Sequence, residues 1–456
     1  MKKETIAVLI VILATGFFLR LYPVFQNQRL LKYDSYYHLR VAELIKSSSS
    51  VPLTQPWPED RPLLYPPGYH FILILVSFFT GGLYQAVRFT LPVLSSLLPL
   101  ASFFFVRKFY NDQASLLTAF FIAVNPFLIN VSYDSPQVIN LFFLLPAVFY
   151  LLKDKFYFSS FFLGLMFLFN PFSALFFTFA ILVFTIFTKF KDSWKILSFP
   201  IIFSLFWYLP RAGGLNNVIG AYFVSKTLNI MAFLNPFLVA SVLSVIFVSK
   251  PKKIFEKFWF FWALFFFAFF CGAFFTSVHH PWRHDVFSAF GASFLAGTVF
   301  SRLKRSDWLK LLAFFCFILS FLGYSVVLYS SQAFHPVLRE QDFYAMTFLN
   351  DSRVKVLSDH DFCATMLTLT EANCVLDLGF ESFNDSRVYD YERFFWTNKP
   401  EQMKSVIDEG DFDFVVFSSN DWGAELLKYL EVNKTYVAFE CWGDYCSKET
   451  SIFKVR

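Results

Sequence analysis

Apolar stretches long enough to cross a membrane recur along the first 330 residues, and short polar connections separate them. An α-helix rises ~1.5 Å per residue, so roughly 20 apolar residues cross the hydrocarbon core of a bilayer. The pattern predicts a polytopic α-helical membrane protein with about 11 transmembrane helices. They are expected near residues 5–25, 84–106, 114–131, 136–152, 156–170, 172–188, 194–210, 230–249, 257–276, 286–301 and 308–330.

The apolar piece 69–82 is short and is expected to lie in the membrane interface. It follows the turn-forming residues 65–68 and ends at Gly81-Gly82. With this piece placed in the first outer loop, 26–83, 17 Lys and Arg residues in short connections fall on one side, as in cytoplasmic loops. We therefore expect a multi-pass protein of the cell membrane with a cytoplasmic N-terminus and an extracytoplasmic segment after residue 331.

Beyond residue 330 the pattern changes to short strand-like and helix-like runs. We interpret the chain as a transmembrane domain, 1–330, followed by a small extracytoplasmic α/β domain, 331–456. Runs rich in β-branched and aromatic residues predict strands, and longer periodic runs predict helices. Strands are expected at 354–357, 374–378, 412–417, 436–439 and 452–455, and helices at 362–370, 400–409 and 421–431.

The composition agrees with this division. The chain has 456 residues, of which 56% are hydrophobic, and this excludes an ordinary soluble globular protein. Residues 1–330 carry 27 Lys and Arg against 12 Asp and Glu, whereas residues 331–456 carry 12 against 22. The net charge of +5 therefore combines a basic membrane body with an acidic tail. No nucleic-acid partner is expected.

The segment Lys32–Arg40 holds Asp34, the first carboxylate after Glu4, at the outer mouth of the first span. A carboxylate at that level is costly unless a charged or polar group meets it. Asp34 is either the cap of a short amphipathic helix or a functional group. The apolar face of that helix would carry Tyr37, Val41, Leu44 and Ile45, and its polar face Arg40, Glu43 and Lys46.

A second carboxylate, Asp134, lies in a very short outer turn between two predicted spans. Asn125-Pro126 is expected to kink the helix that leads to it. Asp34 and Asp134 then share one membrane level, which suits a divalent-cation site or a general base with an electrostatic partner. The structural alternative is that Asp134, which precedes Pro136, caps the following helix.

The outer segment 276–285 is the third stretch with candidate functional residues, after those of Asp34 and Asp134. Its Arg283 can hold an anionic phosphate at the membrane surface, with His280 nearby. Arg211 and Arg88 are weaker candidates for the same role. The His residues of the segment follow no fixed metal-binding spacing, so a solvated loop is the alternative for them.

The segment Asp34–Arg40 resembles the Asp-Pro-Tyr-Tyr-His-Tyr-Arg type of motif in the first outer loop of oligosaccharyltransferase catalytic subunits. That family belongs to the GT-C superfamily of membrane glycosyltransferases, which use polyprenyl-phosphate-linked donors. The turn Tyr133–Pro136 is similar to the family's second acidic motif. The resemblance implies a GT-C fold and transfer of a sugar or oligosaccharide from a polyprenyl or dolichyl phosphate to a peptide, lipid or glycan acceptor, with protein N-glycosylation as one form.

Three departures from the family bear on the metal and the acceptor. Pro136 stands where the family's second motif usually has another carboxylate or a His, and the loop 211–229 has no acid. The tail motif Trp-Trp-Asp-Tyr-Gly, which reads the acceptor Ser or Thr, is missing, and residues 359–363 occupy its expected place. The superfamily is therefore better supported than a peptide acceptor.

The resemblance also implies roles for the residues above. Asp34 would be the general base and, with Asp134, would hold Mg²⁺ or Mn²⁺, unless catalysis is metal-free. Arg283, His280 and Arg211 would bind the departing lipid phosphate. The groove for membrane lipid and acceptor would be lined by Tyr36, Tyr37, His38, Arg40 and Tyr69. A lipid or glycan transporter or flippase, and a non-catalytic glycan-binding relative, are the alternatives.

Overall fold

The computed structural model divides into two compact units, each described here by itself. The first comprises residues 1–28, 65–210 and 222–335, and the second comprises residues 29–64, 211–221 and 336–456. The structure describes residues 1–27, 29–55, 61–63, 65–133, 135–210, 236–272, 282–304 and 306–330, and the strand residues 355–358, 373–374, 414–418, 439–441 and 450–455.

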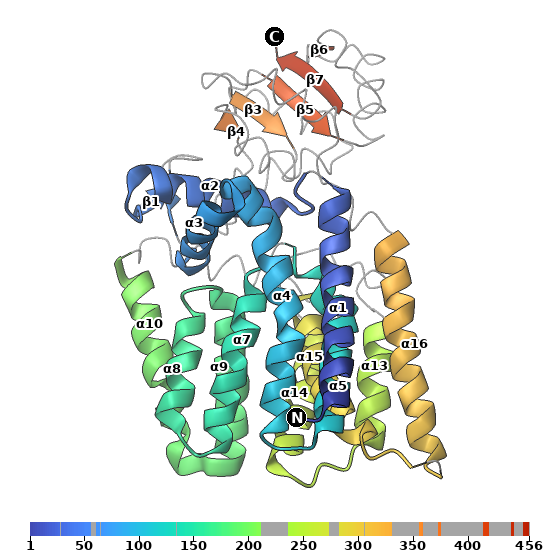
Figure 1. The fold of residues 1–456 in the computed structure, drawn as a ribbon. Helices are drawn as coiled ribbons and strands as arrows, with labels where there is room; N and C mark the ends of the chain where they lie inside the picture. Colours follow the sequence, from blue (N-terminus) through green and yellow to red (C-terminus); the bar gives the residue numbers. More distant parts are fainter. Residues whose placement is uncertain are drawn as a thin grey trace. The chain divides into compact units, whose positions relative to one another are not determined.

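The first unit is a bundle of apolar helices (Figure 1). A helix overlaps each predicted span, and within the described residues four helices, α1, α4, α9 and α16, are long and apolar enough to cross a membrane. The total number of spans stays a prediction. The helices are α1 (Lys3–Gln26), α3 (Gly68–Thr80), α4 (Leu83–Arg107), α5 (Asp112–Val124), α6 (Pro126–Asn130), α7 (Gln137–Leu152), α8 (Phe156–Met166), α9 (Pro171–Lys189), the 3₁₀ helix η1 (Phe190–Leu197), α10 (Ser198–Tyr208), α13 (Pro236–Val248), α14 (Ile254–Gly272), α15 (Trp282–Phe300) and α16 (Trp308–Ser330).

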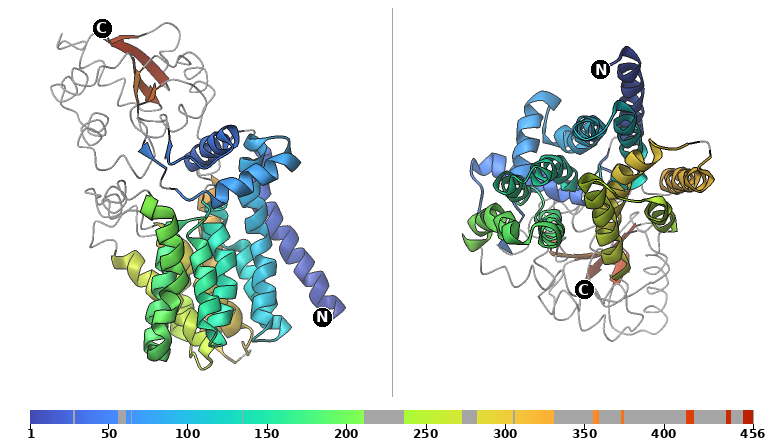
Figure 2. Two further views of the ribbon diagram at one scale, coloured as in Figure 1. Left: turned by 90° about the vertical axis from the view of Figure 1, so that its left-hand side faces the viewer. Right: turned by 90° about the horizontal axis from the view of Figure 1, so that it is seen from below.

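The loops at one end of the bundle carry most of its basic residues, and we call this the basic end. It comprises residues 1–3, 107–108, 153–155, 250–253 and 301–304, at the bottom of Figure 1. A view from below shows several of the bundle helices nearly end-on (Figure 2). The helix α3 has 13 residues, ends at Thr80 and is followed by Gly81, whose φ of +81° suits glycine. The apolar piece 69–82 is thus short and helical, and its place in the membrane interface stays a prediction.

Aromatic side chains pack between α14 and α15. Trp259 stacks on Phe294 with ring centroids 4.2 Å apart, and Trp262 Nε1 donates to the Phe287 carbonyl over 3.0 Å. Gly291 makes room for this contact, because a Cβ there would lie 2.5 Å from the Trp262 ring. Other Phe side chains are 80% or more exposed, which suits a surface in contact with lipid: Phe79, Phe187 and Phe247.

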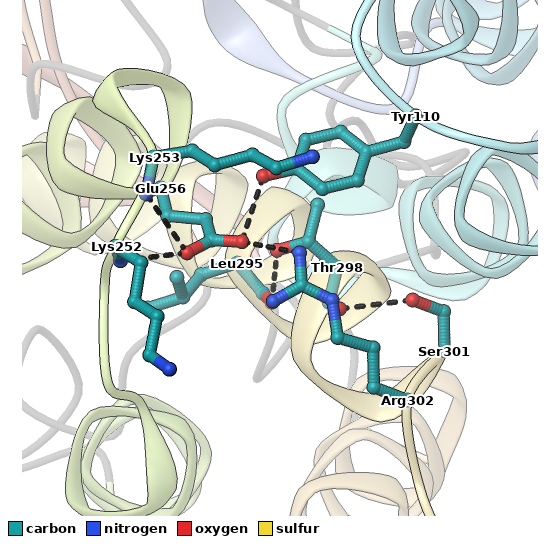
Figure 3. A network of polar contacts seen from close by, with 8 residues as sticks. All are labelled: Tyr110, Lys252, Lys253, Glu256, Leu295, Thr298, Ser301 and Arg302. Carbon is teal, nitrogen blue, oxygen red and sulfur yellow. Dashed lines mark hydrogen bonds and ion pairs between the residues drawn. The ribbon is translucent and has the colours of Figure 1, made fainter.

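At the basic end a buried carboxylate, Glu256, joins three parts of the chain (Figure 3). Its Oε1 accepts hydrogen bonds from Tyr110 OH (2.7 Å) and Arg302 Nη2 (2.5 Å). Its Oε2 accepts from the backbone N–H groups of Lys252 (2.8 Å) and Lys253 (3.3 Å), just before α14 begins. The Lys253 ammonium lies 4.6 Å from the Tyr110 ring centroid. Glu256 thus fixes the start of α14 against the loops that follow α4 and α15.

The second unit contains α2 (Tyr33–Ser48), the antiparallel pair β1 (Thr54–Gln55) and β2 (Arg61–Pro62), and a five-stranded sheet. The order of the sheet is β4-β3-β5-β7-β6. Strand β3 pairs in parallel with β4 and β5, and β7 pairs antiparallel with β5 and β6. The strands are β3 (Lys355–Ser358), β4 (Asn373–Cys374), β5 (Phe414–Ser418), β6 (Phe439–Cys441) and β7 (Thr450–Val455).

Every strand predicted in the tail overlaps a strand of this sheet, although 374–378 and 436–439 do so at one residue each. The helices predicted at 362–370, 400–409 and 421–431 lie outside the described residues. Parallel pairs need crossover connections, since a hairpin turn cannot join them. The α/β character of the tail and the domain boundary at residue 330 stay predictions.

Candidate active site

Asp34 lies in the first turn of α2, where the sequence predicted a short amphipathic helix. The dipole of the helix favours a carboxylate at this end. Val41 and Ile45 are buried, as expected for its apolar face, and Arg40 and Glu43 form an ion pair with 3.8 Å between Nη1 and Oε2. The predicted helix and its two faces are thus confirmed at these positions.

The residues predicted to line a groove differ in exposure. On α2, Tyr36 and His38 are 1% and 2% exposed, whereas Tyr37 and Arg40 are partly exposed. On α3, Tyr69 is 1% exposed. Of these side chains, Tyr37 and Arg40 are the ones that a ligand can reach without rearrangement.

The other predicted site residues are described in part or not at all. Asp134, His280 and Arg211 lie outside the described residues. Arg283 lies in the first turn of α15, and its side chain is also outside them. Backbone N–H groups and the dipole at the start of a helix favour an anion, so the placement of Arg283 is compatible with phosphate binding. Whether Asp34 and Asp134 meet stays a prediction.

The approach to Asp134 is a broken helix, a sharper feature than the predicted kink. Helix α5 ends at Val124 because Asn125, which precedes Pro126, is extended. The Asn125 Oδ1 atom then accepts from the N–H groups of Phe127 (3.0 Å) and Leu128 (3.3 Å), which starts α6. The break turns the chain toward the short connection that carries Asp134.

Hydrogen bonds hold the chain on both sides of Asp134. Ser132 Oγ donates to the Ile129 carbonyl over 2.5 Å, and the N–H of Ser135 donates to the Val131 carbonyl over 3.3 Å. The N–H of Gln137, the first residue of α7, donates to Ser135 Oγ over 3.4 Å. These bonds, made by small hydroxyl residues, fix the backbone at residues 132, 135 and 137, on either side of position 134.

One buried charge in this region was missed by the sequence analysis. Arg20, on α1, is 0% exposed, and its Nε donates to Ser95 Oγ over 2.7 Å. Its Nη1 donates to the carbonyls of Gly16 (3.3 Å) and Ala123 (2.6 Å), and its Nη2 to that of Ile122 (3.1 Å). The signal was present in the sequence, because an Arg inside an apolar span is costly and usually has a specific role.

Arg88, a weaker sequence candidate for phosphate binding, is engaged at the end of α1. Its Nη2 donates to the carbonyls of Val24 (2.8 Å) and Asn27 (2.5 Å), and its Nη1 donates to Gln85 Oε1 (3.0 Å). A helix end leaves carbonyls without intrahelical partners, and a basic side chain satisfies them. The contacts of Arg88 therefore indicate a structural role.

The start of α3 docks on the connection between α8 and α9. The Gly68 N–H donates to the Leu168 carbonyl over 2.9 Å, and a Cβ on Gly68 would lie 2.4 Å from that oxygen. Asn170 Nδ2 donates to Tyr65 OH over 3.1 Å. Burial lowers the pKa of His70, the third residue of α3, to about 3. Its imidazole is therefore neutral near pH 7 and cannot serve as a cation for phosphate.

Metal ligands are sparse in the part of the chain that the structure describes, where no group of three His, Cys, Asp or Glu could hold an ion. Of the two predicted ligands, Asp34 is described and Asp134 is not. A single carboxylate does not make a site for Mg²⁺ or Mn²⁺, which take about six oxygen ligands. The metal site at these two residues stays a prediction.

No protein-family model and no curated protein matches the chain. Solved structures do match. The Archaeoglobus fulgidus oligosaccharyltransferase, crystallised with a tethered acceptor peptide containing the NVT sequon, has a TM-score of 0.64 at 15% identity. That match covers 100% of this chain and 74% of the archaeal one.

Two further proteins share the fold. ArnT from Cupriavidus metallidurans, bound to undecaprenyl phosphate, has a TM-score of 0.60 at 12% identity, covering 99% of this chain and 97% of ArnT. The arabinofuranosyltransferase AftD from Mycobacteria has a TM-score of 0.54 at 10% identity, covering 100% of this chain and 40% of AftD. The fold predicted from the resemblance at Asp34–Arg40 and Tyr133–Pro136 is thus confirmed: the chain has the fold of the GT-C glycosyltransferases.

Proposed function

We propose that the protein is a membrane glycosyltransferase that moves a sugar or oligosaccharide from a polyprenyl- or dolichyl-phosphate-linked donor to an acceptor. The observation that carries the proposal is the match to ArnT, which extends over nearly the whole of both chains. ArnT was solved with undecaprenyl phosphate, and the archaeal oligosaccharyltransferase with dolichol-phosphate and an inhibitory peptide. Two proteins of this fold therefore bind polyprenyl phosphates, which makes such a donor the first to test.

Asp34 is the proposed general base. An acceptor hydroxyl or amide attacks the anomeric carbon, the bond from sugar to phosphate breaks, and the phosphate leaves with the electron pair. The acceptor proton goes to the Asp34 carboxylate, which must stand beside the attacking atom. The position of Asp34 in the first turn of α2, in the segment most like the family, supports this role.

Arg283 is the proposed partner of the departing phosphate. It combines a guanidinium with the N-terminus of α15, and both favour the charge that develops on the leaving group. His280 and Arg211 are proposed as secondary contacts.

Asp134 is proposed to stabilise charge opposite Asp34 or to share a cation with it. With Pro136 in place of a second acid, we expect either weak, donor-assisted Mg²⁺ or Mn²⁺ dependence or metal-free transfer. The archaeal oligosaccharyltransferase has been crystallised with Zn and sulfate. Such an ion would supply positive charge for the leaving phosphate.

We further propose that the basic end faces the cytoplasm, since basic short loops mark that side. Transfer would then occur at the opposite end of the bundle, with residues 331–456 as an extracytoplasmic α/β domain. Tyr37 and Arg40, the partly exposed members of α2, are the proposed contacts for acceptor and lipid, and Tyr36, His38 and Tyr69 would support them from buried positions. Peptide, lipid and glycan acceptors are all to be tried.

The test is transfer by purified protein in lipid nanodiscs, with a radiolabelled polyprenyl-phosphate sugar and each acceptor class. Asp34→Asn should lower turnover more than about tenfold, which corresponds to roughly 1.4 kcal/mol of barrier. Glu43→Gln is the matched control, because it removes a carboxylate from the same helix at a half-exposed position. Equal effects of the two changes would remove Asp34 from the mechanism. Lipid movement across vesicles without transfer would favour a flippase.

A further inference from the structure

Arg20 is the most deeply buried charge of the bundle that the described residues include, and none of its hydrogen bonds goes to a carboxylate. Its partners are three backbone carbonyls and a hydroxyl. An arginine stays charged under all ordinary conditions. The negative end of the α5 dipole is therefore the nearest counter-charge that its contacts supply.

Two prolines leave backbone carbonyls of α1 and α5 without their helical N–H donors. Pro126 has no N–H, so the carbonyl of Ile122 lacks its helical partner, and the break at Asn125 leaves that of Ala123 open as well. Pro23, inside α1, leaves the carbonyl of Leu19 open in the same way. In apolar surroundings no water replaces the missing donors, so other parts of the chain must supply them.

The missing donors come from other parts of the chain. The two terminal nitrogens of Arg20 reach the carbonyls of Ile122 and Ala123, at the end of α5. The open carbonyl of Leu19 accepts from Tyr133 OH (3.4 Å) and Tyr329 OH (2.5 Å). Arg20 and Leu19, which are adjacent on α1, therefore hold the two ends of the segment 122–133. Asp134 follows this segment directly in the chain.

We propose that Arg20 is a positioning residue for Asp134. Its guanidinium fixes where α5 stops and α6 begins, and the Leu19 carbonyl fixes Tyr133 at the other end of the same segment. The proposal rests on the proposed function, because it assumes that Asp134 acts in transfer. The structural part of the proposal, that Arg20 holds residues 122–133 in place, can be tested without measuring transfer.

The test compares Arg20→Met, which removes the charge and the donors, with Arg20→Lys, which keeps the charge but loses the planar fork. Ile12→Ala is the control, because Ile12 is buried on the same helix and makes none of these polar contacts. In nanodiscs we expect Arg20→Met to lower kcat at least thirtyfold while the KM for the donor changes less than threefold. Arg20→Lys should be intermediate, and Ile12→Ala should stay within threefold of the original protein.

The second readout is hydrogen exchange of the full chain in nanodiscs. Backbone amides of residues 125–133 should exchange at least tenfold faster in Arg20→Met and at the original rate in Ile12→Ala. The proposal is overturned if exchange in this segment is unchanged, or if Ile12→Ala loses as much activity as Arg20→Met. If the protein transfers nothing from any polyprenyl phosphate, the proposed function fails, whereas the exchange rates still decide whether Arg20 holds the segment.

If Arg20→Met does not fold, Tyr133→Phe tests whether α1 positions the turn. This change removes one hydroxyl and leaves the contacts of Arg20 in place. We expect a three- to tenfold lower kcat, faster exchange limited to residues 130–133, and an unchanged KM for the donor. Unchanged kcat together with unchanged exchange would overturn the link between α1 and the turn.

Discussion

Replacing Glu256 with Ala should destabilise the bundle from its basic end. The Glu256 side chain is 4% exposed and accepts four hydrogen bonds, two from backbone N–H groups at the start of α14 and two from side chains. Burial and the hydrogen bond to Glu256 raise the pKa of Tyr110, which keeps its hydroxyl protonated as a donor. Removing the carboxylate therefore leaves several donors without an acceptor.

The contacts differ in strength. Loss of the helix-capping bonds to Lys252 and Lys253 costs about 1 kcal/mol. The hydrogen bond from Tyr110 to a charged group contributes about 1.5 kcal/mol. The ion pair with Arg302 adds about 0.5 kcal/mol, because that guanidinium is 48% exposed and solvent screens it. We expect Glu256→Ala to lower the free energy of unfolding by about 3 kcal/mol.

Glu256→Gln keeps one acceptor oxygen and should cost about half as much. The control is Asp307→Ala, which breaks a partly exposed ion pair with Lys310 at the same end and should cost far less than Glu256→Ala, because solvent screens that pair. Unfolding can be followed in mixed micelles by fluorescence, because the buried Trp259 and Trp262 lie further along α14. A cost for Glu256→Ala below about 1 kcal/mol, or no larger than that of Asp307→Ala, would refute this account.

Three further outcomes are expected. A Cys introduced near Lys399 should react with an impermeant thiol reagent in intact cells, whereas one at Lys252 should not, and the reverse pattern would overturn the proposed orientation. After divalent cations are removed with a chelator, turnover should either fall little or recover when millimolar Mg²⁺ or Mn²⁺ is added back. A tight stoichiometric metal in donor-free protein, lost in Asp134→Ala, would show that ligands have been missed. Acidification from pH 7 toward pH 4 should lower the melting temperature, because His70 protonates in the unfolded state near pH 6.5 but in the folded state only near pH 3. In His70→Gln this slope should be shallower, and an equal slope would assign the pH effect to other groups.

The apolar pattern predicted the helices well where a span is uniform. The last predicted span, 308–330, coincides with α16. The predicted span 114–131 was expected to be one kinked helix, and it is two helices, because Asn125 supplies its own cap and makes a full break possible. The predicted start at residue 194 falls within η1, ahead of α10. Apolar residues are common to all these conformations, so their pattern does not distinguish between them.

The candidate site was less predictable than the fold, for two physical reasons. Asp34 and Asp134 are a hundred residues apart, and their spacing in the chain carries no information on their distance in space. Arg20 was missed because it is neither an acid nor close to an outer loop, and it binds carbonyls that Pro126 and the break at Asn125 leave open. A search for charged residues inside apolar spans, combined with the positions of proline, would have pointed to it.

The strand order of the tail sheet has a consequence for how the protein is made. Strand β7, residues 450–455, lies between β5 and β6, and among the described strands it is the one neighbour of β6. During synthesis β6 therefore emerges before the strand that it needs, and it can join the sheet only after residue 455 has been added. A stop codon before residue 450, or a tag that disrupts β7, should thus release β6 as well and expose the edge of β5 to chaperones and proteases.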